Sequence, residues 1–187
     1  MRLAYLWDSR KCIACGACII NCAANYPELR FEKEPNPMWK WLGANIRRVI
    51  REKGKPELRL LSCQHCENAP CVTACPTGAS YIEPETGLVK LNKDKCIGCK
   101  SCIVACPYGA RWLHPKTMYP EKCPGPVCEQ LIARGEEPLC VAVCPAEARD
   151  FGDIDDPQSS ISQKIKRHRV SRMLEHLGTE PKYFVVR

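Results

Sequence analysis

The cysteines of this 187-residue chain are the residues whose number and spacing could do chemistry. There are sixteen, and such a density is typical of a disulfide scaffold or of a metal protein. They fall into four groups of four, and no cysteine is left over. Group one is Cys12, Cys15, Cys18 and Cys22; group two is Cys63, Cys66, Cys71 and Cys75; group three is Cys96, Cys99, Cys102 and Cys106; group four is Cys123, Cys128, Cys140 and Cys144.

The spacing within the groups indicates iron–sulfur clusters. Groups one and three read C-x2-C-x2-C-x3-C, with small or apolar residues between the ligands, so a short loop can wrap a cluster closely. In groups two, three and four a proline follows the last cysteine (Pro76, Pro107 and Pro145). This is the bacterial ferredoxin run, in which the fourth cysteine ligates the other 4Fe–4S cluster of a pair. Four such runs predict two two-cluster units.

Other uses of cysteine fit this pattern poorly. A zinc site pairs two C-x2-4-C arms across a loop, and a third cysteine at the same short interval has no place in a tetrahedral site. Disulfides between cysteines this close would be strained. The C-x3-C-x2-C triplet of radical-SAM enzymes does not occur.

The net charge of +7 points to clusters rather than to nucleic acid. A basic excess usually suggests a nucleic-acid or anionic membrane partner. An oxidised 4Fe–4S cube with four thiolates carries about −2, so four of them contribute roughly −8. The excess of Lys and Arg then compensates the clusters. The alternative from another functional class is a zinc-stabilised module that binds nucleic acid. Visible absorption by the purified protein would exclude it.

Three stretches carry a family resemblance: C-Q-H-C-E-N-A-P-C-V-T-A-C-P-T-G-A from Cys63, K-C-I-G-C-K-S-C-I-V-A-C-P-Y-G-A-R from Lys95, and P-L-C-V-A-V-C-P-A-E-A-R-D-F-G-D from Pro138. Over most of its length the chain resembles the four-cluster iron–sulfur subunit of the DMSO reductase family of molybdenum or tungsten enzymes. Polysulfide, thiosulfate, tetrathionate and arsenate reductases and some formate dehydrogenases have similar subunits.

The resemblance implies a nested set of ligands, four cysteines for each of four 4Fe–4S clusters. Cluster one would have Cys12, Cys15, Cys18 and Cys144; cluster two Cys63, Cys66, Cys71 and Cys106; cluster three Cys96, Cys99, Cys102 and Cys75; cluster four Cys123, Cys128, Cys140 and Cys22. Group four departs from the usual family pattern, because four residues rather than two separate Cys123 from Cys128. The prolines and glycine there predict a tight turn that presents both sulfurs.

The implied fold is α+β, with two nested bacterial-type ferredoxin-like units and loop-rich insertions. Residues 1–62 and 118–150 would form the outer unit with clusters one and four. Residues 63–117 would form the inner unit with clusters two and three. Residues 151–187 would form a C-terminal helix and tail that is clamped either on a partner or on its own domain.

The implied function is electron transfer without a catalytic site, because the sequence has no phosphate-binding loop, catalytic triad or metal-hydrolase motif. One partner would be a large molybdopterin or tungstopterin catalytic subunit, and the other a quinone-reactive membrane anchor. Neither nucleic acid nor a small-molecule substrate would bind directly. The alternative is a soluble polyferredoxin-type subunit of a cytoplasmic formate dehydrogenase or hydrogenase complex.

The sequence also predicts a peripheral position at the membrane. The chain has no apolar run of the roughly 20 residues that a membrane span needs and no signal-peptide pattern. The family resemblance implies export, together with the catalytic subunit, to the extracytoplasmic face. Complexes of the same build on the cytoplasmic face leave that side open.

Between and after the cysteine groups, the sequence predicts three local structures. Residues 38–51 are read as a short helix with exposed arginines, either packed on the outer unit or docking a partner. Residues 80–89 are read as a hairpin that turns at Glu83–Gly87. A helix capped by Ser159 or Ser160 is expected to run toward Gly178, followed by an extended tail at 183–186.

Three residues near the ligands could tune cluster potentials by charge or hydrogen bonding. Lys95 and Arg111 flank group three and are candidates for neutralising charges. His65 lies between Cys63 and Cys66, where a solvated loop position is the plainer expectation.

Overall fold

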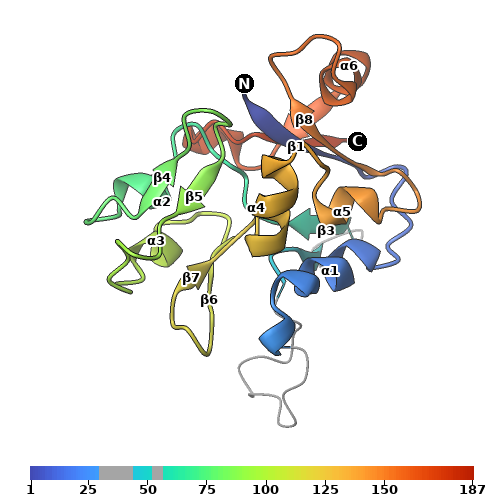
Figure 1. Cartoon of the computed structure of the whole chain (residues 1–187). Helices are drawn as coiled ribbons and strands as arrows, with labels where there is room; N and C mark the ends of the chain where they lie inside the picture. Colours follow the sequence, from blue (N-terminus) through green and yellow to red (C-terminus); the bar gives the residue numbers. More distant parts are fainter. Residues whose placement is uncertain (30–43, 52–56) are drawn as a thin grey trace.

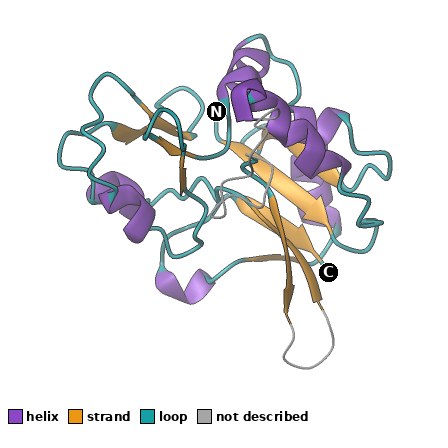
Figure 2. Ribbon diagram, turned by 90° about the horizontal axis from the view of Figure 1, so that it is seen from below, coloured by secondary structure: helices purple, strands orange, loops and turns teal. Residues whose placement is uncertain are grey.

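The computed structural model describes residues 1–29, 44–51 and 57–187. It mixes short helices and short strands, as the predicted α+β class requires, and loops connect them over much of the chain (Figure 2). Within the described residues no helix is long and apolar enough to cross a membrane.

The helices are short because a proline comes directly after the fourth cysteine in three of the four groups. A proline disfavours the helical conformation at the residue before it. In groups two, three and four, where that proline is present, α2 (Pro70–Thr73), α3 (Ser101–Val104) and α5 (Leu139–Ala142) each make about one turn. Group one lacks the proline, and α1 (Ala17–Cys22) continues directly into the 3-10 helix η1 (Ala23–Asn25).

A four-stranded sheet joins the two ends of the chain. Its order is β8 (Arg149–Asp153), β1 (Leu3–Asp8), β10 (Tyr183–Val186) and β9 (Val170–Arg172). Strand β1 pairs antiparallel with β8 and parallel with β10, so the first and last strands of the chain are neighbours (Figure 1). The extended tail predicted at 183–186 is confirmed, and it is held by its own domain.

Both faces of β1 are buried, which explains why its sequence is apolar almost throughout. Ala4 and Leu6 pack on one face against Ile161, which is fully buried. Tyr5 and Trp7 point to the other face and pack among the cysteines of the main core. The sheet therefore has a cysteine-rich side and an aliphatic side.

Helix α6 (Ser160–Arg167) covers the aliphatic side. The predicted cap is confirmed, since the Ser159 hydroxyl accepts a hydrogen bond from the Ser162 amide at 3.2 Å. The predicted continuation of this helix as far as Leu177 is wrong. The helix ends at Arg167 because the following residues are needed as strand β9, and Gly178 instead ends a separate 3-10 turn with φ +64°.

Three two-stranded ribbons complete the structure. They are β2 (Arg47–Arg51) with β3 (Glu57–Leu61), β4 (Ser80–Ile82) with β5 (Val89–Leu91), and β6 (Trp112–Leu113) with β7 (Pro120–Glu121), all antiparallel. The hairpin predicted at 80–89 is confirmed. The helix predicted through 47–51 is wrong, because Val49 and Ile50 are β-branched residues that suit a paired strand; the rest of that prediction, at 38–43, lies outside the described residues.

The cysteine helices pack in two pairs. Helix α1 packs against α5, and α2 packs against α3, although both members of the first pair lie far apart in the sequence. Figure 1 shows α2, α3 and the β4–β5 hairpin on one side of the molecule and α1 and α5 on the other. Helix α4 (Pro126–Ala133) lies between the two sides.

Candidate metal centres

All sixteen cysteines lie in the described part of the chain, and none forms a disulfide. Most are buried or half-buried. The two exposed ones are Cys15 and Cys99, the second cysteines of groups one and three. We call the four predicted ligand sets quartets one to four.

Quartet one lines a single cavity. Cys12, Cys15 and Cys18 come from the loop before α1 and from α1 itself, while Cys144 arrives from group four. The packing of α1 on α5 is what brings that fourth thiol across. Arg149 also lines this cavity.

Quartet two lines a second cavity in the same manner. Its first three cysteines belong to group two, and Cys106 belongs to group three. The pairing of α2 with α3 joins them. Arg111 and Tyr108 lie in its wall, as does the buried β5 residue Val89.

Quartet three has one buried cysteine, Cys102, and one exposed cysteine, Cys99, while Cys75 and Cys96 are half-buried. The Ser101 hydroxyl and amide lower the pKa of Cys99, and the negative charge of Cys75 acts against them. Burial raises the pKa of Cys102, and the charge of Cys96 contributes in the same direction. These interactions place Cys75, from group two, within electrostatic range of group three.

Quartet four is the most buried of the four, since each of its cysteines is buried. Burial raises the pKa of Cys22 to about 12, with a further contribution from the charge of Cys140. Burial also raises the pKa of Cys123, again helped by Cys140 and Cys22. Thiols this far from water lose their protons only to a strong compensating charge, such as the iron of a cluster.

The loops of groups one and three have the same backbone shape. Ala14 and Gly98 occupy equivalent positions with φ of +57° and +68°. Gly16 and Lys100, two residues later, have φ of +79° and +65°. Left-handed conformations at Ala14 and Lys100 are strained. Each loop therefore has the same two left-handed positions, with glycine at one and a strained residue at the other, and this shared shape fits loops that enclose the same kind of group.

The widened group four is stabilised by a side chain from group one. The side-chain oxygen Oδ1 of Asn25 accepts hydrogen bonds at 3.1 Å from the amides of Val127 and Cys128, in the first turn of α4. Its Nδ2 donates to the Cys22 carbonyl at 2.8 Å. Glycine at position 125 provides the space for the Asn25 side chain, because a Cβ there would lie 2.6 Å from Asn25 Cγ. The turn predicted between Cys123 and Cys128 thus buries both sulfurs.

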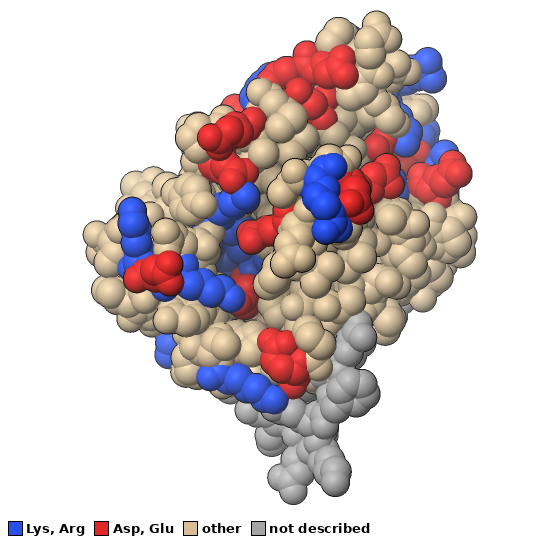
Figure 3. Space-filling model, viewed as in Figure 1, with Lys and Arg blue, Asp and Glu red and all other residues tan. Residues whose placement is uncertain are grey.

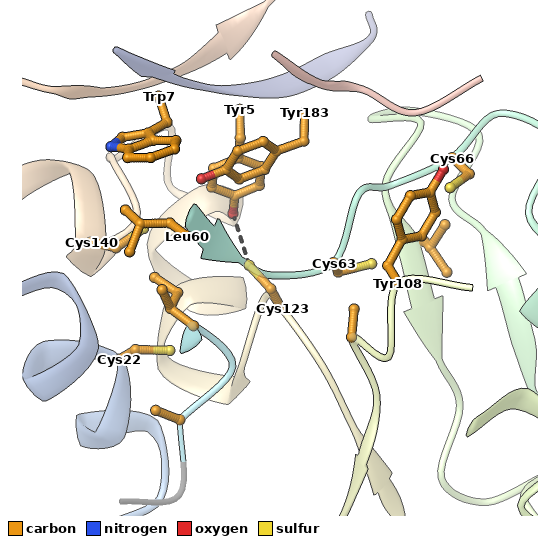
Figure 4. Packing of buried hydrophobic residues seen from close by; sticks show 14 of the residues in the cluster. Tyr5, Trp7, Cys22, Leu60, Cys63, Cys66, Tyr108, Cys123, Cys140 and Tyr183 are labelled. Carbon is orange, nitrogen blue, oxygen red and sulfur yellow. Dashed lines mark hydrogen bonds between the residues drawn. The ribbon is translucent and has the colours of Figure 1, made fainter. Parts of the chain in front are cut away.

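Tyr5 contacts quartet four from the central sheet. Its hydroxyl lies 3.4 Å from Cys123 Sγ and is the donor whenever that sulfur is a thiolate (Figure 4). Burial raises the pKa of Tyr5 well above its usual value, so the hydroxyl keeps its proton. In Figure 4, Cys140, Cys123 and Cys63 follow one another across the core.

His65 is not a solvated loop residue, and that expectation was wrong. It is fully buried, its Nδ1 accepts a hydrogen bond from the Val89 amide at 3.1 Å, and its ring stacks on Tyr5. Burial lowers its pKa far below the usual value, and the charge of Lys122 lowers it further. The ring therefore acts as a neutral acceptor inside the core.

Arg111 behaves as the sequence predicted, as a charge directed at the thiols. Its side chain is buried, and its Nη2 lies 3.4 Å from Cys71 Sγ and donates to Ser80 Oγ. Burial alone would lower its pKa, but the thiolates of Cys71 and Cys102 outweigh it and the pKa is raised.

Three further buried cations, Lys122, Arg149 and Lys182, were not predicted from the sequence. Lys122 comes directly before Cys123, as Lys95 comes before Cys96. Arg149 comes five residues after the last cysteine of its group, as Arg111 does. That repeated C-P-x-x-A-R pattern was the signal that could have identified Arg149. Lys95 itself lies exposed at the surface.

The donor set suits iron–sulfur clusters. In the ranges that the structure describes, no three His, Cys, Asp or Glu side chains converge tightly enough for one metal ion. The thiols of quartets one and two instead surround cavities. Arg111 Nε and Nη1 and Arg149 Nε are buried without a protein acceptor, which leaves donors for inorganic or cysteinyl sulfur. Figure 3 shows acidic and basic side chains intermixed on one face, without a basic stripe of the kind that tracks nucleic acid.

Comparison with known proteins gives the same picture. A sequence family described as a 4Fe-4S dicluster domain matches residues 58–154, and a second family with that description matches residues 11–79. The B subunit of the polysulfide reductase of Wolinella succinogenes is 41% identical over 96% of this chain and 91% of its own length. The NrfC homolog of Haemophilus influenzae is 39% identical over 98% of this chain and 79% of its own length.

A third relative extends the range of reductases. The arsenate respiratory reductase iron-sulfur subunit ArrB of a Shewanella species is 32% identical over all of this chain and 97% of its own length. These relatives are named as components or iron–sulfur subunits of reductases, which agrees with a protein that has no catalytic site of its own. This protein belongs to the 4Fe–4S dicluster family of electron-transfer subunits that serve molybdenum-type oxidoreductases.

Proposed function

We propose that the protein binds four 4Fe–4S clusters, one at each quartet, and conducts electrons between two partner subunits. Bound clusters of this type, with four cysteine ligands each, exchange one electron at a time. The ligand sets are the nested ones. They are Cys12, Cys15, Cys18 and Cys144 for cluster one; Cys63, Cys66, Cys71 and Cys106 for cluster two; Cys96, Cys99, Cys102 and Cys75 for cluster three; and Cys123, Cys128, Cys140 and Cys22 for cluster four.

The helix pairs support two nested ferredoxin-like units. The packing of α1 on α5 fits an outer unit built from residues 1–62 and 118–150. The packing of α2 on α3 fits an inner unit of residues 63–117. Residues 151–187 add α6 and the strands β9 and β10 to the sheet of the outer unit.

The observation that carries the proposal is the gradient of cysteine burial along the molecule. Cys15 of quartet one and Cys99 of quartet three are exposed, whereas every cysteine of quartet four and all but one of quartet two are buried. Charges of Cys140 act on Cys18, and those of Cys71 act on Cys102. These links, with Lys122 acting on both Cys123 of quartet four and Cys63 of quartet two, support the order one, four, two, three, with exposed cysteines at the two ends.

Each end presents an exposed aliphatic pair at equivalent sequence positions. Ile13 and Ile20 are 66% and 56% exposed beside quartet one. Ile97 and Val104 are 67% and 86% exposed beside quartet three. Exposed aliphatic side chains around a redox site fit protein partners that cover them. Polysulfide and arsenate reductase relatives suggest their identity: a pterin-containing molybdenum or tungsten catalytic subunit at one end, and a quinone-reactive membrane anchor at the other.

This arrangement makes the chain a peripheral component of a membrane-bound complex, on the extracytoplasmic face if the catalytic subunit is exported.

The chain's own residues keep water from the inner sites and supply donors and charges to the sulfurs. Tyr5, Asn25 and Arg111 are three examples, and each has a polar side-chain atom within hydrogen-bonding reach of a cysteine sulfur.

Iron and acid-labile sulfide per chain, measured on anaerobically prepared protein, test the proposal. We expect about 16 of each, and broad EPR signals from interacting spins after dithionite reduction. A value near 12 of each would contradict a fourth cluster. The matched variants Cys128→Ser and Ser101→Ala separate a ligand from a neighbour: the first should remove about four irons and the second none.

A further inference from the structure

Four cations are buried in the described part of the chain without a carboxylate in contact. Three of them, Arg149, Lys122 and Arg111, each act on thiols of two quartets, whereas Lys182 donates to the Gly87 carbonyl. Arg149, Lys122 and Arg111 are 4%, 3% and 4% exposed. Within the described part of the chain none of the three forms an ion pair with Asp or Glu, and Glu129 acts on Lys122 only at longer range. A buried charge without a counter-charge costs several kcal/mol. The groups that chiefly compensate these cations must therefore be the thiolates and the clusters that they ligate.

Arg111 lies at the junction of quartets two and three. Its Nη2 is 3.4 Å from Cys71 Sγ, in quartet two. Its charge also acts on Cys102, in quartet three. Both are the third cysteines of their groups.

Arg149 lies at the equivalent junction of quartets one and four. Its charge acts on Cys140, in quartet four, and on Cys18, in quartet one, again the third cysteines of their groups, and its side chain lines the cavity of quartet one. Its Nη1 donates to the Tyr183 hydroxyl at 3.1 Å, and the guanidinium lies over the Tyr183 ring at 5.8 Å from its centre. These contacts fix the charge in place.

Lys122 lies at the remaining junction, between quartets four and two. Its Nζ donates to the Cys123 carbonyl at 3.0 Å. Its charge acts on Cys123, of quartet four, and on Cys63, of quartet two. Each of the three junctions along the order one, four, two, three therefore has one buried cation.

We propose that Arg149, Lys122 and Arg111 are potential-setting residues, each of which raises the reduction potentials of the two clusters that flank it. This inference rests on the ligand sets of the proposed function. Reduction adds a negative charge to a cluster, and a nearby fixed cation stabilises the reduced form. Clusters four and two each have two flanking cations. Their reduction potentials should therefore be higher than burial of the clusters alone would give.

The test is a redox titration of the cluster-loaded chain, followed by EPR, for Arg149→Gln, Lys122→Gln and Arg111→Gln. Each variant should lower the equilibrium constant for reducing its two flanking clusters about tenfold, which is about 59 mV for a one-electron couple. The two potentials that fall in R149Q should be the two that stay in R111Q, and K122Q should lower one from each pair.

Arg149→Lys and Arg111→Lys are the matched controls, because they keep the charge and alter the guanidinium contacts. Their potentials should stay near those of the unmodified chain. A tenfold change in the lysine variants, equal shifts of all four clusters, or no shift in the glutamine variants would overturn the inference. If one glutamine variant does not assemble, the other two still decide it, because any two of the three are expected to lower different pairs of potentials. Fewer than about 16 irons in the unmodified chain would contradict the proposed function itself, whereas full iron with unshifted potentials overturns this inference alone.

Discussion

Gly125 is the residue whose replacement should test most directly how the fourth site is built. It precedes α4 with φ −87° and ψ 174°, a conformation that alanine adopts without strain. The obstacle is steric, because a Cβ would lie 2.6 Å from Asn25 Cγ and 2.7 Å from Asn25 Cβ. Gly125→Ala must therefore displace the side chain that joins Cys22 to Cys128.

The expected cost has two contributions. Forcing a carbon into a filled site costs about 1–3 kcal/mol. The displaced Asn25 also gives up its hydrogen bonds to the amides of Val127 and Cys128, at roughly 1 kcal/mol each. A total of about 3–5 kcal/mol is large beside a typical stability of about 5–15 kcal/mol. Because the damage is local to quartet four, we expect loss of about four irons per chain.

A double-mutant cycle separates this steric explanation from a general effect of alanine. In Asn25→Gly both obstructing carbons, Cβ and Cγ, are gone, so adding Gly125→Ala should cost almost nothing more. Iron content and the urea concentration that bleaches half of the visible absorption are the measurements, with exposed Gln130→Ala on α4 as control. If Gly125→Ala lowers the bleaching midpoint equally with and without Asn25, the close contact is not the cause.

Three further outcomes are expected. Tyr5→Phe removes the hydroxyl near Cys123 and should lower the potential of one cluster only, seen by redox titration; a shift of all four would contradict that contact. Ile161→Ala empties a fully buried site under the sheet, so the free energy of unfolding in urea should fall by about 2–5 kcal/mol while iron content stays unchanged. Ile20→Glu and Val104→Glu should each release a different partner from a tagged complex on co-purification, with iron retained; release of the same partner by both would argue against two docking ends.

The family could be predicted from the cysteine pattern because ligation is local chemistry. Three thiols within seven residues allow few uses other than one cluster, whatever the rest of the fold does. The single-turn helices depend on the same stretch, since the prolines after the fourth cysteines end them. The hairpin at 80–89 was also local, with a turn signal between two short apolar runs.

The features that the sequence did not reveal depend on contacts between distant segments. The parallel pairing of β1 with β10 joins residues near both ends of the chain, and no local pattern marks it. That pairing places Tyr5 against His65, which turned an expected surface residue into a core acceptor. The end of α6 and the helix predicted through 47–51 were wrong for a related reason. The apolar spacing there allows helix or strand, and pairing with a partner strand decides between them.

The composition of the core explains why cations can be buried here at all. Seven cysteines belong to the main buried cluster, beside Tyr5, Trp7 and Tyr183. Without ligated metal this would be a small apolar core around buried cations that lack carboxylate partners, which is an unfavourable arrangement. With clusters bound, the same cations face negative charge, and the sulfurs occupy fixed positions. The binding energy of the clusters is then also folding energy, so the residues that set the potentials and the residues that hold the fold are the same ones.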